Sequence, residues 1–236
     1  MTIIDPLQPA PKSRAPEVRN AYRFLKGAHD SVVALFDVSQ TLSSARRASN
    51  VGRQGRMNTQ EIDLLRAAIV FTASGLDASM TRLVNDAGRY LITRPESAAR
   101  AQYEEFLKAE ISKPQVSSGM KSAITSADPA GQMVDYYFAV RTKASFQGSE
   151  ELKRRVRNTL GIPRNRLSDS RIISSDIFFI ARNAIVHSMD YVQENDSGKT
   201  KRTHRSADSV AYLCNDAFLL WSEFIDATAD ELKSSR

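Results

Sequence analysis

The amino-acid sequence predicts an all-α protein with no significant sheet. Apolar residues recur at alternating spacings of three and four along several long segments, which is the period of one face of an α-helix. No segment shows convincing alternation of apolar and polar residues, and no Asn-Gly hairpin turn is present. We therefore expect an all-α fold with no obvious internal repeat.

Length and composition are those of an ordinary globular protein. The chain has 236 residues, of which 42% are hydrophobic and 25% are charged, enough for a sizeable core. We expect a flexible, Pro-rich arm over residues 1–14 and a single all-α domain over residues 15–236. The longest apolar runs are too short to cross a bilayer, and the N-terminus lacks the pattern of a signal peptide, so we expect a cytoplasmic protein that does not enter membranes.

The first two helices are expected to be long. Pro16 suits a first helical turn, and the apolar pattern that follows ends between residues 41 and 48. Residues 49–57 hold two glycines without periodicity and are expected to form a loop. Asn58 and Glu61 form a capping-box pattern at the start of the second helix, whose small residues would allow a neighbouring helix to approach closely.

The later elements are shorter and less regular. Segment 113–127 is polar and is expected to be a linker or short helical turns, and residues 162–170 a loop. Further helices are expected from Pro95 to about Ser112, from Asp128 to about Val140, from Ser149 to a C-cap at Gly161, and from Ser206 to about Ile225.

The most apolar segment, about residues 175–194, also carries an arginine and a histidine. As one helix capped by Ser174 or Ser175, it would have a polar strip opposite its main apolar stripe. The stripe would contain Ile177, Phe178, Ala181, Ile185, Met189 and Val192, and the strip would contain Asp176, Asn183, His187, Asp190 and Glu194. Phe179, Ile180, Val186 and Tyr191 would border the strip with further apolar side chains.

These apolar borders need a second apolar contact to cover them. The simplest source is another copy of the same helix across a two-fold axis, which predicts a homodimer with two Asn183/His187 pairs in one cleft. Arg182 lies one residue off the strip, and its long stem would let the guanidinium reach the cleft.

The charge distribution favours a polyanionic partner. The net charge is +6 and basic residues cluster on both sequence flanks of the apolar segment. The candidate RNA-binding residues are Arg154, Arg155, Arg157, Arg164 and Arg166 before it, and Lys199, Lys201 and Arg202 after it. Two solvated basic loops would give the same pattern, so charge alone leaves both interpretations open.

The chemistry of the apolar segment suits cleavage of RNA. His187 is the plausible general acid/base and can take a proton from the ribose 2′-OH, while Arg182 can stabilise the phosphorane's negative charge. The competing interpretation is a core histidine bonded to a neighbouring helix, with Arg182 in a salt bridge. Cys214 falls on an apolar stripe and is expected to be a reduced core thiol. Three scattered histidines and one cysteine suggest no metal site, and we expect no cofactor.

The segment Ala181-Arg182-Asn183-Ala184-Ile185-Val186-His187 closely resembles the signature of the HEPN superfamily, in which an arginine precedes a histidine by four to six intervening residues. Segment 64–78 is similar to the helix that packs beside that signature in RiboL-PSP and MAE-type HEPN proteins. The resemblance covers roughly residues 58–230, and segment 113–170 departs from a minimal HEPN domain.

The resemblance implies an antiparallel helical bundle with additional helices, which dimerises to form one composite cleft. Many active members of the family are metal-independent endoribonucleases that leave a 2′,3′-cyclic phosphate and act as toxins or phage-defence effectors. It implies that Arg182 and His187 are catalytic, that Asn183 orients or contacts phosphate, and that an antitoxin or regulatory protein can be a partner. Some members lack nuclease activity, so a non-catalytic module that binds RNA or a protein remains the second hypothesis.

Overall fold

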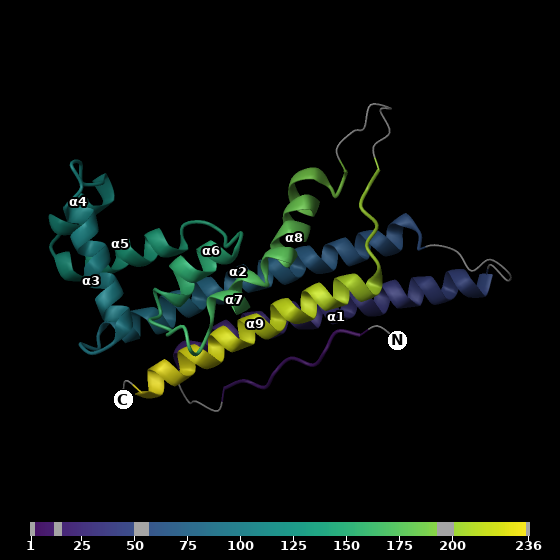
Figure 1. Ribbon diagram of the computed structural model, residues 1–236, viewed down its shortest axis with the longest axis horizontal. Helices are drawn as coiled ribbons and strands as arrows, with labels where there is room; N and C mark the ends of the chain where they lie inside the picture. Colours follow the sequence, from purple (N-terminus) through teal and green to yellow (C-terminus); the bar gives the residue numbers. More distant parts are fainter. Residues whose placement is uncertain (1–2, 12–15, 50–56, 193–200, 235–236) are drawn as a thin grey trace.

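Three long helices form the body of the molecule in the computed structural model (Figure 1). The structure describes residues 3–11, 16–49, 57–192 and 201–234. Helices α1 (Pro16–Ser49) and α2 (Thr59–Ile92) form a long antiparallel pair, and α9 (Ala207–Ser234) packs against both and runs parallel to α2. The described residues contain one isolated antiparallel bridge, between Tyr191 and Arg202, and otherwise no strand pairing. The predicted all-α class is confirmed.

Small residues allow α1 and α2 to approach closely, as their sequence predicts. A Cβ placed on Gly75 of α2 would lie 2.0 Å from the Cβ of Ala28 on α1, so only glycine fits there. One turn further along, Ser79 donates a hydrogen bond of 2.9 Å to the carbonyl of Ala21 across the same interface. Burial of the apolar faces of these helices supplies the main stabilisation of the bundle.

The core between α2 and α9 is centred on Trp221. Its ring is buried, and its indole nitrogen donates a hydrogen bond of 3.2 Å to the carbonyl of Leu76. Cys214 is also buried in this interface and accepts a hydrogen bond of 3.3 Å from Thr72. Burial raises the pKa of the Cys214 thiol to about 12, although the bond from Thr72 acts in the opposite direction. Cys214 is therefore a core thiol, as predicted.

The shorter helices lie beside the long ones and agree broadly with the predicted segments. Asn58 forms the predicted capping box with Glu61, and Asp128 caps α5 with Pro129 in its first turn. The remaining elements are α3 (Ala98–Ile111), α4 (Ser118–Ile124), α5 (Pro129–Thr142), α6 (Ser149–Glu151), the π-helical segment η1 (Leu152–Arg157), α7 (Asp169–Ile173) and α8 (Asp176–Ser188). Helices α3, α4 and α5 gather at one end of the long bundle (Figure 1).

The predicted helix over residues 149–161 is divided between α6, η1 and a turn that ends at Gly161. This glycine has a φ of 69°, and an added Cβ would lie 2.5 Å from the backbone nitrogen of Ala99. Its position after the last helical turn is the one predicted from the sequence. The third helix, in contrast, begins at Ala98 rather than at Pro95, because Ser97 serves as its N-cap.

The N-terminal segment is extended and lies along the bundle. Ile4 is buried, and the backbone N–H of Asp5 donates a hydrogen bond of 3.0 Å to Asn215 of α9. The hydroxyl of Tyr22 on α1 donates 2.9 Å to the carbonyl of Gln8. Residues 3–11 therefore bind the surface of α1 and α9. Among the helices of the described residues, none combines the length and apolar character needed to cross a bilayer.

Candidate functional site

Helix α8 carries the candidate catalytic residues and crosses over the long helices instead of running along them (Figure 1). Ser175 occupies the N-cap position without a side-chain capping bond. The carboxylate of Asp176 instead accepts hydrogen bonds of 2.8 and 2.9 Å from the backbone N–H and hydroxyl of Ser149, which tie the first turn of α8 to α6.

The helix ends at Ser188, earlier than the sequence predicts. Met189 and Asp190 have φ angles of 50° and 64°, and two successive left-handed residues cannot continue an α-helix. The backbone N–H of Asp190 turns back and donates a hydrogen bond of 2.8 Å to the carbonyl of Ala184. The predicted end near residue 194 is therefore wrong.

The early end changes which side chains share a face. Phe178, Phe179, Ala181 and Ile185 are buried, and the ring of Phe179 lies 6.1 Å from that of Trp221. The prediction placed Phe179 at the border of the polar strip, and three predicted members of the apolar stripe are exposed: Ile177, Met189 and Val192. The early end of the helix explains Met189 and Val192, which lie beyond it, whereas Ile177 and Phe179 lie within α8 and were assigned to the wrong face.

His187 is exposed near the free end of α8. Within the described chain it has no hydrogen-bond or ion-pair partner, so the alternative of a buried histidine bonded to a neighbouring helix is wrong. Exposed apolar side chains lie along the same helix and just after it, with Ile180 68% exposed and Met189 61% exposed. Ile177 and Val186 are exposed as well. A histidine and an uncovered apolar surface thus share this part of the molecule.

Arg182 lies on a different side of α8 from His187. Five residues of α-helix separate their directions by about 140°, and within the described chain no hydrogen bond joins them. The guanidinium of Arg182 donates 2.8 Å to the side-chain oxygen of Asn183 and is close enough to Asp77 of α2 to affect its ionisation. One chain therefore does not bring the predicted pair together.

Asp77 of α2 is an acidic group that interacts electrostatically with Arg182. Burial raises the pKa of its carboxyl, and this effect is partly offset by a hydrogen bond of 2.7 Å from the backbone N–H of Phe146 and by the charges of Arg155 and Arg182. The carboxylate favours a positive charge beside it. It is a residue that the sequence did not single out, because only the crossing of α8 over α2 brings it near Arg182.

Asp190 was predicted on the polar strip beside His187, and that placement is wrong. The side chain is completely buried and accepts hydrogen bonds from Arg66 of α2 and Arg205, which precedes α9. One signal for this contact was present in the sequence, since Arg66 interrupts an otherwise apolar stretch of α2.

The predicted RNA-binding residues separate into two groups. Arg155 and Arg157 are buried: Arg155 donates to the carbonyls of residues 141, 144 and 145, and Arg157 donates to Leu167 and pairs with Asp169. These two predictions are wrong because both cations hold loops in place inside the fold.

The other predicted cations that the structure describes are exposed or form ion pairs at the surface. Arg166 pairs with Asp230, and Arg202 pairs with Asp63 at 2.9 Å and lies over the ring of Tyr191. Arg154, Arg164 and Lys201 are exposed, and Arg164 has only a weak contact of 3.8 Å with Asp169. Lys199 lies outside the described residues. The exposed members remain candidates for contact with phosphate.

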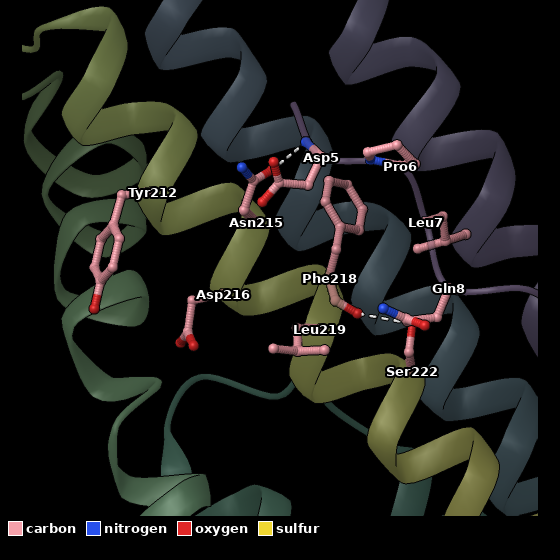
Figure 2. Close-up of a pocket in the computed structure, with 10 residues that line it drawn as sticks. All are labelled: Asp5, Pro6, Leu7, Gln8, Tyr212, Asn215, Asp216, Phe218, Leu219 and Ser222. Carbon is pink, nitrogen blue, oxygen red and sulfur yellow. Dashed lines mark hydrogen bonds between the residues drawn. The ribbon is translucent and has the colours of Figure 1, made fainter. Parts of the chain in front are cut away.

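A separate groove of about 340 Å³ lies between the N-terminal segment and α9 (Figure 2). Its walls include Pro6 and Leu7 on one side and Phe218 and Leu219 on the other, so its surface is mostly apolar. None of the predicted catalytic or RNA-binding residues lines it. In the part of the chain that the structure describes, no group of three or more His, Cys, Asp or Glu side chains is placed to hold a metal ion.

Comparison with known proteins adds no further assignment. No protein-family model, no curated protein and no solved structure matches this chain.

Proposed function

We propose that this chain is a HEPN-type, metal-independent endoribonuclease that acts as a homodimer in the cytoplasm. The observation that carries the proposal is the position of the Arg182-to-His187 motif on a helix whose histidine is exposed and free of partners in the described chain. An imidazole that makes no internal hydrogen bond can accept a proton from a substrate hydroxyl.

The proposed reaction assigns a role to each residue of the motif. His187 takes the proton of a ribose 2′-OH, whose oxygen attacks the adjacent phosphorus atom. The bond from phosphorus to the 5′ oxygen breaks, the leaving oxygen receives a proton from the second histidine of the dimer, and a 2′,3′-cyclic phosphate remains. Arg182 stabilises the additional negative charge of the phosphorane, and Asn183, bonded to Arg182 at 2.8 Å, orients the guanidinium or contacts the phosphate.

The dimer in this proposal follows from two features of α8. Arg182 and His187 point about 140° apart on one helix, so a second copy is needed to place an arginine and a histidine on the same phosphate. Exposed Ile177, Ile180, Val186 and Met189 give the helix an apolar surface that a second copy would cover. Both features support a composite cleft between two α8 helices.

The test is cleavage of RNA by the purified chain in EDTA. We expect the wild type to cut single-stranded RNA and leave 2′,3′-cyclic phosphate ends, and His187→Ala to lose at least a hundredfold in rate, in line with removal of a general acid/base. His204→Ala is the matched control, because His204 is also exposed but lies outside α8. Equal rates for the two variants would contradict the assignment of His187.

The second candidate is a non-catalytic HEPN module that binds RNA or a protein partner through the same surface. The hydrogen bond from Arg182 to Asn183 and the electrostatic attraction of Asp77 favour it, since both draw the guanidinium away from His187 within one chain. RNA that binds with steep salt dependence but stays uncut would support this candidate.

A growth test addresses the proposed role as a toxin or phage-defence effector. Expression of the wild type should slow growth, and His187→Ala should not. Relief of the growth defect by a cognate antitoxin or regulatory protein would identify that partner. Equal growth of the two strains would argue against the toxin role.

A further inference from the structure

Three segments meet at the buried carboxylate of Asp190, two residues after the end of α8. We propose that Asp190, held by Arg66 and Arg205, is a positioning residue that fixes the last turn of α8 and thereby the direction of His187. We call these three residues the Asp190 clamp. The inference rests on the proposed function only for the role of His187, and the structural part is testable without RNA.

Both oxygens of the Asp190 carboxylate are used. Arg205 donates two hydrogen bonds, one of 2.7 Å from a terminal nitrogen to Oδ1 and one of 2.9 Å from Nε to Oδ2. Arg66 donates a third, of 3.0 Å, from its Nε to Oδ2. The paired bonds from Arg205 fix orientation as well as distance, because a planar guanidinium matches a planar carboxylate.

Arg66 extends the clamp to the chain that returns toward α9. One terminal nitrogen donates 2.7 Å to the carbonyl of Thr203, and the backbone N–H of Thr203 donates 2.8 Å to the carbonyl of Asp190. The N–H of Val192 donates 2.8 Å to the carbonyl of Lys201 one step further out. The end of α8, the returning segment and α2 are therefore joined through one carboxylate.

The clamp acts directly on the turn that carries His187. Asp190 and Met189 donate backbone hydrogen bonds of 2.8 and 3.0 Å to the carbonyls of Ala184 and Ile185, so the last turn of the helix closes on the clamp. Met189 and Asp190 have positive φ angles, which are strained for residues other than glycine. Such a conformation persists only where the surrounding structure imposes it. The clamp supplies those surroundings.

Other contacts on this turn come from the buried side chain of Ile185 and from Arg202, which donates a hydrogen bond of 3.0 Å to the carbonyl of Met189. The side chains of His187 and Ser188 are exposed. Exposed helix ends open locally unless they are tied down. A catalytic imidazole has to stay within about 0.5 Å of its productive position, and in this chain the Asp190 clamp provides that restraint.

The first test uses hydrogen exchange on the full chain. Asp190→Asn keeps the size of the side chain but removes its charge and one acceptor. We expect exchange in residues 184–190 to become at least tenfold faster, while residues 176–183 and helices α1, α2 and α9 keep their protection. Asp135→Asn is the matched control, because Asp135 of α5 also pairs with an arginine, Arg89 at 2.6 Å, but is exposed and belongs to neither the clamp nor α8.

Unchanged exchange in residues 184–190 would overturn the clamp, and so would equal acceleration throughout the bundle. If Asp190→Asn does not fold, Arg205→Gln removes the paired contact and leaves Arg66 in place, and the same pattern of exchange is expected. Asp190→Glu should recover part of the lost protection, because it restores the charge.

The second test separates the clamp from the proposed nuclease. Where the wild type cuts RNA, Asp190→Asn should lower kcat at least tenfold with little change in KM, and Asp135→Asn should leave both unchanged. Faster exchange with an unchanged kcat would overturn the positioning role. A wild type that does not cut RNA would contradict the proposed function, while the exchange experiment would still decide the clamp.

Discussion

The guanidinium of Arg205 donates two hydrogen bonds, of 2.7 and 2.9 Å, to the completely buried carboxylate of Asp190. Asp190 lies near the start of the connection from α8 to α9 and Arg205 near its end, so this contact joins the two ends of the connection. A buried carboxylate without its partners would be costly, because charge leaves water only when it is paired. The stability of this region should accordingly depend on the ionisation of Asp190.

Acid should weaken the contribution of Asp190 to stability. Burial alone would raise the pKa of this carboxyl, but the hydrogen bonds from Arg205 and Arg66 outweigh burial and hold the pKa below its ordinary range. A group with a lowered folded-state pKa stabilises the fold above its unfolded pKa, about 3.9 for Asp, and loses that contribution as the pH falls through the folded value.

We therefore expect Asp190→Asn to lower the free energy of unfolding by about 3 kcal/mol at pH 7, in line with the loss of one partner from a buried ion pair. The difference between wild type and variant should shrink as the pH falls below about 4. Urea unfolding of both proteins between pH 7 and pH 3 measures it. A difference that stays constant over this range would show that the charge of Asp190 is not what stabilises the fold.

Replacing Ile180 by aspartate should prevent the proposed dimer. The side chain is 68% exposed, so the substitution leaves the core of one chain intact but places a charge on the apolar surface of α8. We expect a monomer in sedimentation experiments and loss of RNA cleavage. The thermal unfolding of the single chain should be unchanged. Ile111→Asp is the control, since Ile111 is 53% exposed on α3. A dimer that survives Ile180→Asp would place the interface elsewhere.

Neighbouring arginines of η1 should respond differently to substitution. Arg155→Ala leaves the carbonyls of Arg141, Ala144 and Ser145 without their donor and removes the guanidinium from the ring of Phe146, so we expect a loss of about 3 kcal/mol in unfolding free energy. Arg154 is exposed, and Arg154→Ala should leave that free energy within about 0.5 kcal/mol of wild type.

RNA binding should show the reverse order for these two arginines. If Arg154 contacts one phosphate, Arg154→Ala should reduce the slope of log K against log salt by about 0.7, the value for one contact on a single strand. Fluorescence anisotropy with a labelled oligoribonucleotide over a range of salt concentrations measures this slope. An unchanged slope would remove Arg154 from the RNA-binding surface.

Two glycines should respond oppositely to alanine. At Gly75 the new Cβ would lie 2.0 Å from the Cβ of Ala28, so α1 and α2 would have to separate, and we expect a loss of about 1–3 kcal/mol in unfolding free energy. At Gly27, in the middle of α1, nothing lies within 4 Å of the new Cβ. Gly27→Ala should stabilise the protein by up to about 1 kcal/mol through helix propensity. Thermal unfolding of both variants measures the difference between their stabilities. Equal destabilisation by the two substitutions would contradict the prediction.

The sequence by itself determined the features that depend on near neighbours in the chain. The capping box of Asn58 and Glu61, the N-cap at Asp128 and the glycine at the end of the α6–η1 segment could all be predicted, because each depends on contacts within a few residues. The apolar periods of α1, α2 and α9 likewise predicted the all-α class. The Arg182-to-His187 motif could be found because all its residues lie within one short segment of the sequence.

Only the tertiary structure decided where α8 ends and which arginines are available at the surface. The helical period continues past Ser188, yet Asp190 leaves the helix because Arg66, 124 residues away in sequence, and Arg205 bind its carboxylate. Arg155 and Arg157 belong to a basic cluster in sequence but donate to carbonyls and to Asp169 inside the fold. A long polar side chain takes whichever partner the packing brings near it, and the packing depends on the whole chain.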